Sequence, residues 1–352
     1  ETNTIINSAE GGNIELTGSF NLKDTIKTEH GNISVNALGD VVQADDSFNA
    51  FESAGNFDLS ADNVVGTDDQ SLNVDVSGNV NISGNGTSDI YLASKDSDLN
   101  ITSVSDANNL NIDASKAVNV SRDITAYNSV NINAQEGFNQ ADSSTIYNTG
   151  AGGVNITNSG SGDVQISNID SQGGAVNVEN NASGGKLNIS GDIYSDSNID
   201  LSSQNGIEQA DGSSITLEGS SSNNITISNA GNGDVNLKDV SNTEGNINIS
   251  NQTGSGSAPT PGNINLGGVI NSDSGNISIA ADGNISQTTD GTSVQAGGNI
   301  DLDAGQNIGS DGNTVIVSSG GTVNADAQTG GVHLTGDNTD IELGNINAGT
   351  DI

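Results

Sequence analysis

The chain has 352 residues and a formal net charge of −38, because 45 Asp and Glu residues outnumber seven Lys and Arg. With so few cations it cannot neutralise nucleic-acid phosphates or bind an anionic membrane surface. Cys is absent, so the fold has no disulfide framework and is indifferent to the redox compartment.

The first predicted elements are short apolar–polar–apolar phrases, each usually opened by Gly-Asn. The phrase reads Asn13-Ile14-Glu15-Leu16, returns as Asn32-Ile33-Ser34-Val35, and has later copies such as Asn299-Ile300-Asp301-Leu302. Because side chains alternate along a strand, both apolar residues of a phrase lie on one face. Each phrase therefore predicts one short strand with one buried face. We expect the Asn that opens it to form a stacked amide ladder or to cap the turn.

The first third of the chain is less regular than the rest. Phe48, Phe51 and Phe57 lie close together, and five of the seven basic residues occur by position 122. This pattern indicates either a wider coil or an excursion from the repeat.

From Val154 onward the phrase recurs in two runs, at intervals of 10 to 12 residues within each run. Its first apolar residues there are Val154, Val164, Val176, Leu187 and Ile199, followed by Ile215, Ile225, Val235 and Ile247. The Gly and Asn residues between copies supply the positive-φ corners that tight turns need. No stretch shows a sustained 3.6-residue apolar period, so the sequence predicts an all-β protein.

Strands this short are not stable as isolated hairpins, so they must be buried by neighbouring copies. Two phrases per circuit give a coil of about 20 to 25 residues, the size of a solenoid repeat. We therefore predict a right-handed parallel β-helix, since parallel crossover connections are almost always right-handed. No composition shift marks a second domain, so residues 1–352 are expected to form one repeat domain, a segment of a longer chain.

Residues 252–262 interrupt the repeat with a Gly/Ser/Pro stretch that contains both prolines of the chain. Proline is tolerated where no ladder hydrogen bond is needed, so this stretch is predicted to be a loop that leaves one coil. Pro259, Thr260 and Pro261 are therefore the candidate ligand-contact residues.

A longer repeat is centred on Gln, usually followed by Ala-Asp. It occurs around Gln43, Gln140 and Gln209, and in a variant form at Gln287. Alternation from Phe138 directs Gln140 inward, so we interpret the four glutamines as structural positions whose amides bond backbone groups at corners. The alternative interpretation is a binding motif displayed at intervals.

The Gly-Asn-Ile phrases and the Gln-Ala-Asp blocks resemble the repeat region of filamentous haemagglutinin-type exoproteins. The resemblance covers essentially all 352 residues. It implies a right-handed β-helix from a large two-partner-secreted adhesin of Gram-negative bacteria. The Asn-Pro-Asn signature of that family's secretion domain is absent, so the resemblance is to the shaft.

Enzymes also occur on β-helices, and their residue patterns are matched only in part. Asn338-Thr339-Asp340 is similar to one element of the β-helical pectin hydrolases, and Asp45-Asp46 and Asp68-Asp69 to another. Neither His30 nor His333 lies in the Gly-His-Gly of those enzymes, and the only arginine is followed by Asp. We therefore expect a protein that is not an enzyme, with a polysaccharide-degrading enzyme as the third hypothesis.

Metal and cofactor sites have weak support in the sequence. Two distant histidines make no zinc constellation, and the calcium-binding nonapeptide Gly-Gly-x-Gly-x-Asp-x is not repeated. Gly160-Ser161-Gly162-Asp163 and Gly231-Asn232-Gly233-Asp234 are isolated echoes of it. We expect no cofactor, with weak calcium binding at one or two corners as the alternative.

These observations predict the extracellular shaft of a bacterial adhesin, exported through the outer membrane. Its expected partners are host or bacterial glycans and matrix, bound weakly and multivalently, and an outer-membrane transporter. It is expected not to be embedded in a membrane, since no apolar run is long enough and no leader precedes Glu1. The alternative is a subunit that self-assembles with other copies into a filament or surface layer.

Overall fold

The computed structural model describes residues 6–8, 12–253, 261–289, 291–337 and 340–350. These residues form parallel β-strands and no helix, wound as a β-solenoid of about 14 turns. The all-β parallel β-helix prediction is thereby confirmed. The chain divides into two compact units, residues 1–162 and 163–352. Within the described parts, no helix has the length and apolar character required to cross a membrane.

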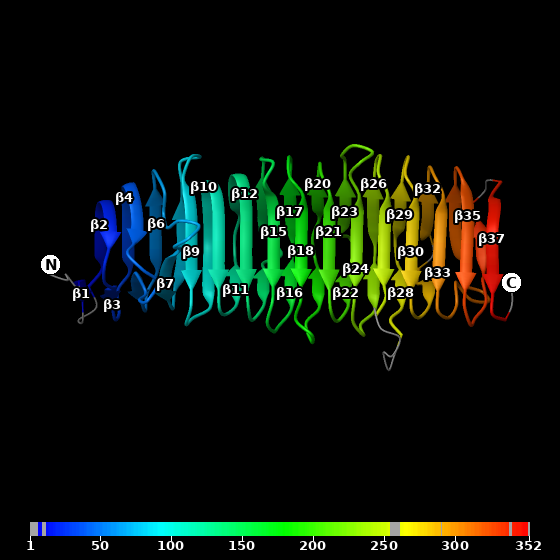
Figure 1. Cartoon of the computed structure of the whole chain (residues 1–352), viewed down its shortest axis with the longest axis horizontal. Coiled ribbons are helices and arrows are strands. Elements are labelled where there is room, and N and C mark those ends of the chain that lie inside the picture. Colours follow the sequence, from blue (N-terminus) through cyan, green and yellow to red (C-terminus); the bar gives the residue numbers. More distant parts are fainter. Residues whose placement is uncertain (1–5, 9–11, 254–260, 290, 338–339, 351–352) are drawn as a thin grey trace. The chain divides into compact units, whose positions relative to one another are not determined.

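The first unit contains strands β1 to β15, drawn in blue to green in Figure 1. Its strands are β1 (Ile6–Ser8), β2 (Ile14–Leu22), β3 (Ile26–Thr28), β4 (Ile33–Gln43), β5 (Phe51–Ser53), β6 (Phe57–Ala61), β7 (Leu72–Val76), β8 (Asn79–Ser83), β9 (Asp89–Ser94), β10 (Leu99–Ala114), β11 (Val118–Val120), β12 (Ile124–Ala134), β13 (Phe138–Gln140), β14 (Thr145–Asn148) and β15 (Gly153–Asn158).

Long strands in this unit bend around corners of the solenoid. Strand β2 pairs with β4 from Ile14 to Leu22, with a register shift after Gly18. Strand β10 shows the same behaviour beside β12, with shifts on both sides of Ala107. Asp106, at that bend, has φ 55°, the only positive φ of a non-glycine residue in the described chain. The irregularity expected in the first third is therefore explained by strands that turn corners without breaking.

The phenylalanines of the first third belong partly to the core. Phe51 and Phe57 are fully buried on consecutive strands β5 and β6. Their rings are tilted, with centroids 5.1 Å apart, a favourable aromatic arrangement. Phe48 is only half-buried, in the connection that precedes β5, and its carbonyl accepts a hydrogen bond from Asn73 Nδ2 (3.3 Å).

The second unit consists of three rows of parallel strands. Each of its first six turns contributes one strand to each row, and the last two contribute only an isolated bridge residue, Ile308 and Val332, to one of them. One row is β18 (Val176–Asn180), β21 (Ile199–Ser203), β24 (Ile225–Asn229), β27 (Ile247–Asn251), β30 (Ile277–Ala281), β33 (Ile300–Ala304), β35 (Thr322–Ala327) and β37 (Glu342–Ala348). The second row is β16 (Val164–Ile166), β19 (Leu187–Ile189), β22 (Ile207–Gln209), β25 (Val235–Leu237), β28 (Ile264–Leu266) and β31 (Ile285–Gln287). The third row is β17 (Asn168–Ser171), β20 (Ile193–Ser195), β23 (Ser214–Leu217), β26 (Asp239–Asn242), β29 (Val269–Ser272), β32 (Ser293–Ala296), β34 (Val315–Ser319) and β36 (Leu334–Gly336).

Three strands per turn differ from the two phrases per circuit that the spacing predicts. The additional strand is typified by β20, which has buried Ile193 and Ser195 on either side of outward Tyr194. With a single large apolar residue, such a strand shows too little alternation to be recognised in sequence.

The length of a turn in the second unit follows from its register. Partners Ile277 and Ile300 are 23 residues apart, within the predicted range of 20 to 25. Partners Ile247 and Ile277 are 30 residues apart, in the turn that contains residues 252–262. The Gly/Ser/Pro stretch therefore lengthens one turn without changing the pairing of the strands that flank it.

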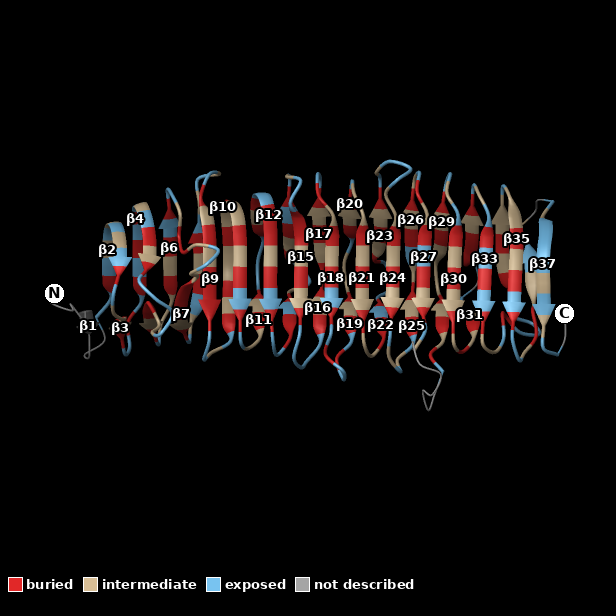
Figure 2. Cartoon of the chain, viewed as in Figure 1, coloured by how far each residue is buried: buried red, intermediate tan, exposed pale blue. Residues whose placement is uncertain are grey.

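Burial follows the alternation that the phrases predict. In Figure 2, buried and less buried residues alternate along the strands of each unit. Ile225, Ile247, Ile277 and Ile300 are fully buried in successive strands of one row of the second unit. Burying each such side chain stabilises the fold by about 1.5–3 kcal/mol. A few apolar residues per turn thus suffice, because each turn covers the next.

Candidate functional site

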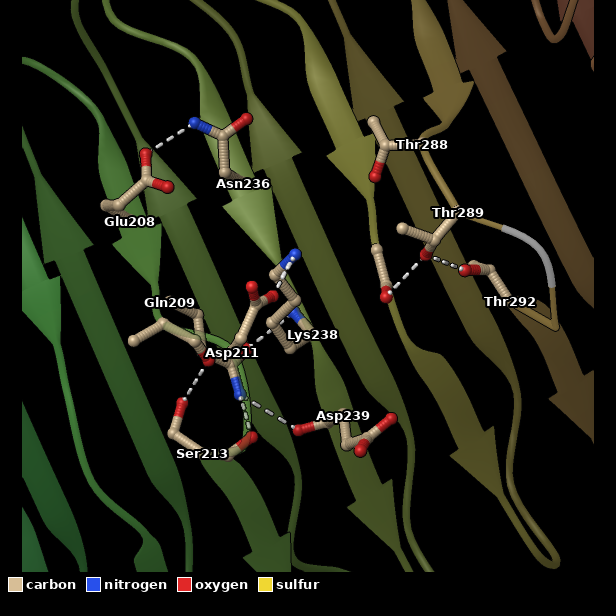
Figure 3. Close-up of polar contacts among 12 residues, drawn as sticks. Glu208, Gln209, Asp211, Ser213, Asn236, Lys238, Asp239, Thr288, Thr289 and Thr292 are labelled. Carbon is tan, nitrogen blue, oxygen red and sulfur yellow. Dashed lines mark hydrogen bonds and ion pairs between the residues drawn. The ribbon is translucent and has the colours of Figure 1, made fainter.

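The Gln-Ala-Asp block at Gln209 forms a corner at the end of β22, shown in Figure 3. Backbone pairing between β22 and β25 includes Ile207 with Val235 and ends at Glu208 with Asn236. The fully buried Gln209 side chain continues this hydrogen-bond pattern beyond the last backbone pair. Its Nε2 donates to the carbonyls of Ser213 and Asp239 (both 3.1 Å), and its Oε1 accepts the backbone N–H of Lys238 (2.9 Å). The side-chain amide thus replaces a peptide group where the strand ladder stops.

The other glutamines make the same kind of bond. Gln287 Nε2 donates to the Thr292 carbonyl (2.8 Å), and Gln287 Oε1 accepts the Ile316 N–H (3.1 Å). Gln43 accepts the N–H of Asn73 (2.7 Å) and donates to the Asp45 carbonyl (2.7 Å). Buried Gln140 donates to the Ser144 carbonyl (3.1 Å), on the inward side that alternation from Phe138 predicts. All four amides therefore bond backbone groups at corners.

The outward residues of these blocks are alike in three copies, where Asp45, Asp142 and Asp211 are exposed, and differ in the fourth. After Gln209, the 91% exposed Asp211 side chain lies 2.7 Å from Lys238 Nζ. After Gln287, the corresponding corner carries Thr289, whose Oγ1 donates to the Gly267 carbonyl (2.8 Å) (Figure 3). A displayed recognition motif would require a common outward chemistry. All four corners share the inward amide, whereas the outward Asp is common to three of them.

A second set of side-chain bonds runs along the corners that open the phrases. In the first unit, Asn32 N–H donates to Asn13 Oδ1 (2.9 Å), and Asn56 N–H donates to Asn32 Oδ1 (2.8 Å). In the second unit, Asn276 N–H donates to Asn246 Oδ1 (2.9 Å), and Asn299 N–H donates to Asn276 Oδ1 (2.8 Å). Each Asn thus accepts the backbone N–H of its equivalent on the next turn. This asparagine ladder explains why Asn precedes Ile.

The predicted ligand-contact loop lies largely outside the described residues. Pro259 and Thr260 are not described, and Pro261 is exposed. On the near side of the loop, Thr253 donates through its N–H and Oγ1 to Asp282 Oδ2 (both 2.8 Å). The described beginning of the loop is therefore fixed to the following turn.

The candidate catalytic carboxylates have ordinary surroundings. Asp45 accepts hydrogen bonds from Ser47, which hold the pKa of its carboxyl below the usual value. Asp46 is 3.9 Å from Lys95, while Asp68 and Asp69 are exposed in a turn. Asn338 and Thr339 of the third candidate element lie outside the described residues. These pairs carry the features of solvated turns, not of a closed catalytic cleft.

The histidines and the two partial matches to the calcium-binding nonapeptide also lie at corners. His30 is exposed in the first unit, whereas His333 in the second unit has Nδ1 3.4 Å from Asp311. In the echoes, Asp163 Oδ1 accepts the Lys186 N–H (2.8 Å) and Asp234 Oδ1 accepts the Asn263 N–H (2.9 Å). Across the described part of the chain, no group of three or more His, Asp or Glu side chains is arranged to hold a metal.

The structure also forms a charged groove that the sequence does not reveal. Lys27, Glu52 and Asp75 are in register on β3, β5 and β7 of the first unit. They line a groove of about 310 Å³ together with Glu29. Lys27 Nζ lies 2.9 Å from Glu52, whose hydrogen bond and charge raise the lysine pKa. Residues more than 20 positions apart in sequence meet here, so only knowledge of the register could have predicted the groove.

Outward tyrosines add to the polar surface. The hydroxyl of Tyr127 donates to Asp106 (3.1 Å) and that of Tyr194 to Asp196 (2.6 Å). The hydrogen bonds to these carboxylates raise the pKa of both phenols, because ionisation would remove the donated proton and place two negative charges together. The tyrosines are therefore neutral hydrogen-bonding groups on an acidic surface.

No known protein family matches the chain, and no curated protein or solved structure is significantly similar to it.

Proposed function

We propose that the chain is the shaft of a secreted bacterial adhesin of the filamentous haemagglutinin type. In this function the solenoid spaces and displays binding elements at the cell surface and makes weak, multivalent contacts of its own. Its partners are glycans and matrix proteins, and it reaches the surface by export through the outer membrane.

The observation that supports this proposal best is the structural use of the repeated motifs. The inward glutamines and the opening asparagines all bond the backbone of their own or an adjacent turn. What remains outward is a surface of amides, hydroxyls and carboxylates with a strong negative charge. Such a surface favours neutral or cationic partners and many weak contacts over one deep site.

The proposal is tested with the chain coupled to fluorescent beads at graded density. The beads are applied to surfaces of immobilised neutral glycans and of matrix proteins, with beads carrying a charge-matched Glu/Ser/Gly polypeptide as the control. We expect retention that rises steeply with coupling density, because multivalent binding multiplies weak affinities. Retention no greater than the control at every density contradicts the adhesive part of the proposal.

Self-assembly is the second candidate function, and one surface of the second unit favours it. Leu343 on β37 is 60% exposed beside an apolar hollow of about 310 Å³, lined in part by Val332, Leu334, Ile341 and Ile346. A strand from another copy would cover these side chains and pair with β37. Sedimentation velocity over a range of concentrations tests this. We expect association that is weakened by Leu343→Ser, and a monomer at all concentrations contradicts it.

A further inference from the structure

The dipeptide Asn-Gly occurs three times in the sequence, at Asn85-Gly86, Asn205-Gly206 and Asn232-Gly233. In this dipeptide the glycine nitrogen can attack the asparagine side-chain carbon, because glycine has no Cβ to obstruct the approach. The reaction requires two things of the folded chain. The glycine N–H must be free to lose its proton, and the asparagine amide must be free to turn.

Both requirements fail at Asn205. The N–H of the buried Gly206 donates to Asn229 Oδ1 (2.8 Å). The Asn205 side chain is itself held, because its Nδ2 donates to the Gly184 carbonyl of the preceding turn (2.9 Å). The nucleophile and the electrophile are thus fixed by separate hydrogen bonds.

Both requirements also fail at Asn85, although this residue is exposed. The Gly86 N–H donates to the Asp106 carbonyl (2.6 Å). Asn85 Nδ2 donates to the Asp62 carbonyl (3.0 Å), and Asn85 Oδ1 accepts from Thr87 Oγ1 (2.8 Å). Exposure alone therefore does not make this asparagine reactive.

Asn232 differs from the other two. It is exposed in the bend between β24 and β25, and neither its side chain nor the Gly233 N–H makes a hydrogen bond to any described residue. The bend itself is fixed, because buried Asn229 Nδ2 donates to the carbonyls of Gly231 (3.1 Å) and Gly233 (3.0 Å). Asn232 is thus exposed and Gly233 partly exposed, while the backbone around them is held.

We propose that Asn232 is a self-modification site, which deamidates spontaneously in the folded protein while Asn85 and Asn205 are protected. Solvent base removes the Gly233 amide proton, and the nitrogen attacks Asn232 Cγ. Ammonia leaves and a five-membered succinimide forms. Water then opens one of the two imide C–N bonds. The products are aspartate, or isoaspartate with the backbone running through the former side chain, and one water is consumed for each ammonia released.

The modification alters the corner in two ways. It adds a carboxylate two residues before Asp234, whose Oδ1 accepts the N–H and the Nδ2 of Asn263 on the next turn (2.9 and 3.1 Å). In the isoaspartate product it also adds one methylene to the backbone between β24 and β25. Both changes affect the hydrogen bonds between Asp234 and Asn263, which join adjacent turns.

The test is to incubate the folded chain at mildly alkaline pH and follow each Asn-Gly site by peptide mass spectrometry and isoaspartate analysis. The same chain unfolded in urea serves as the reference, and Asn232→Gln, which would have to close a larger ring, confirms the assignment. In the folded chain we expect Asn232 to convert about tenfold or more faster than the other two sites, which corresponds to about 1.4 kcal/mol of local opening. In urea the three rates should converge, since no fold remains to protect Asn85 and Asn205.

Two results overturn the proposal. One is an intact Asn232 in the folded chain under conditions that convert it in urea. The other is conversion of Asn85 or Asn205 in the folded chain as fast as Asn232. A signal that persists in Asn232→Gln would show that the modified residue lies elsewhere, which also contradicts the assignment.

Discussion

The corner glutamines allow a direct test of their structural role through Gln209→Leu. Leucine has a similar volume and fills the same space, so packing changes little. It removes three hydrogen bonds and leaves the Lys238 N–H and the carbonyls of Ser213 and Asp239 without their partner. At about 1 kcal/mol for each buried bond, the corner loses about 3 kcal/mol.

Amide hydrogen exchange is the appropriate assay, because a repeat protein opens locally and a single unfolding midpoint averages over its turns. We expect exchange of the Lys238 amide to accelerate by about a hundredfold, the equivalent of about 3 kcal/mol. The control is Glu208→Gln, one residue earlier, where the side chain points outward to Asn236. Its effect should stay within about 0.5 kcal/mol. If Gln209→Leu leaves Lys238 exchange unchanged, the amide does not hold the corner.

Three further predictions concern other parts of the fold. Asn276→Ala should accelerate exchange of its partner amide on the next turn about fivefold, for a loss of about 1 kcal/mol, whereas Asn276→Asp should retain the bond at neutral pH and weaken it in acid, where the acceptor loses its charge. Gly231→Ala should destabilise its corner in thermal unfolding, because a Cβ there would overlap the backbone carbonyl oxygen of Gln204 on the preceding turn. Exposed Gly184→Ala, with open space around it, should be tolerated. Ser47→Ala should raise the pKa of Asp45 toward its usual value in an NMR titration. The pKa is lowered because hydrogen bonds from Ser47 favour the carboxylate, and these bonds are lost as the pH falls. An unchanged titration would contradict this cause.

Much of the fold could be predicted from the sequence because the phrases are strictly alternating. Ile277 and Ile279, for example, both point inward on β30, with Ser278 between them outward. The third row as a whole could not be predicted, although the phrase at Ile215 belongs to it, since a strand such as β20 buries Ser195 where a second apolar residue would have signalled it. Tertiary context forms that strand, because it pairs with neighbours on both sides.

The candidate site was also predictable from the sequence only in part. The inward direction of Gln140 follows from local alternation and was predictable. Its bonding partners were not, because the reach of such an amide depends on which turn lies beside it. Gln209 bonds Lys238, 29 residues later, and Gln43 bonds Asn73, 30 residues later. Contacts at that separation depend on the length of each turn, which the sequence pattern gives only approximately.

The asparagine ladder has a direction, and this bears on how the chain can be assembled. Every bond in it joins a side-chain oxygen to the backbone N–H of the turn that follows. A turn that has already formed therefore presents hydrogen-bond acceptors to the turn that follows it. We expect folding that advances from the amino-terminal side, each turn serving as the template for the next, and pulse-labelled hydrogen exchange during refolding would detect the order. Folding of this kind requires only one completed turn at a time as the template for the next.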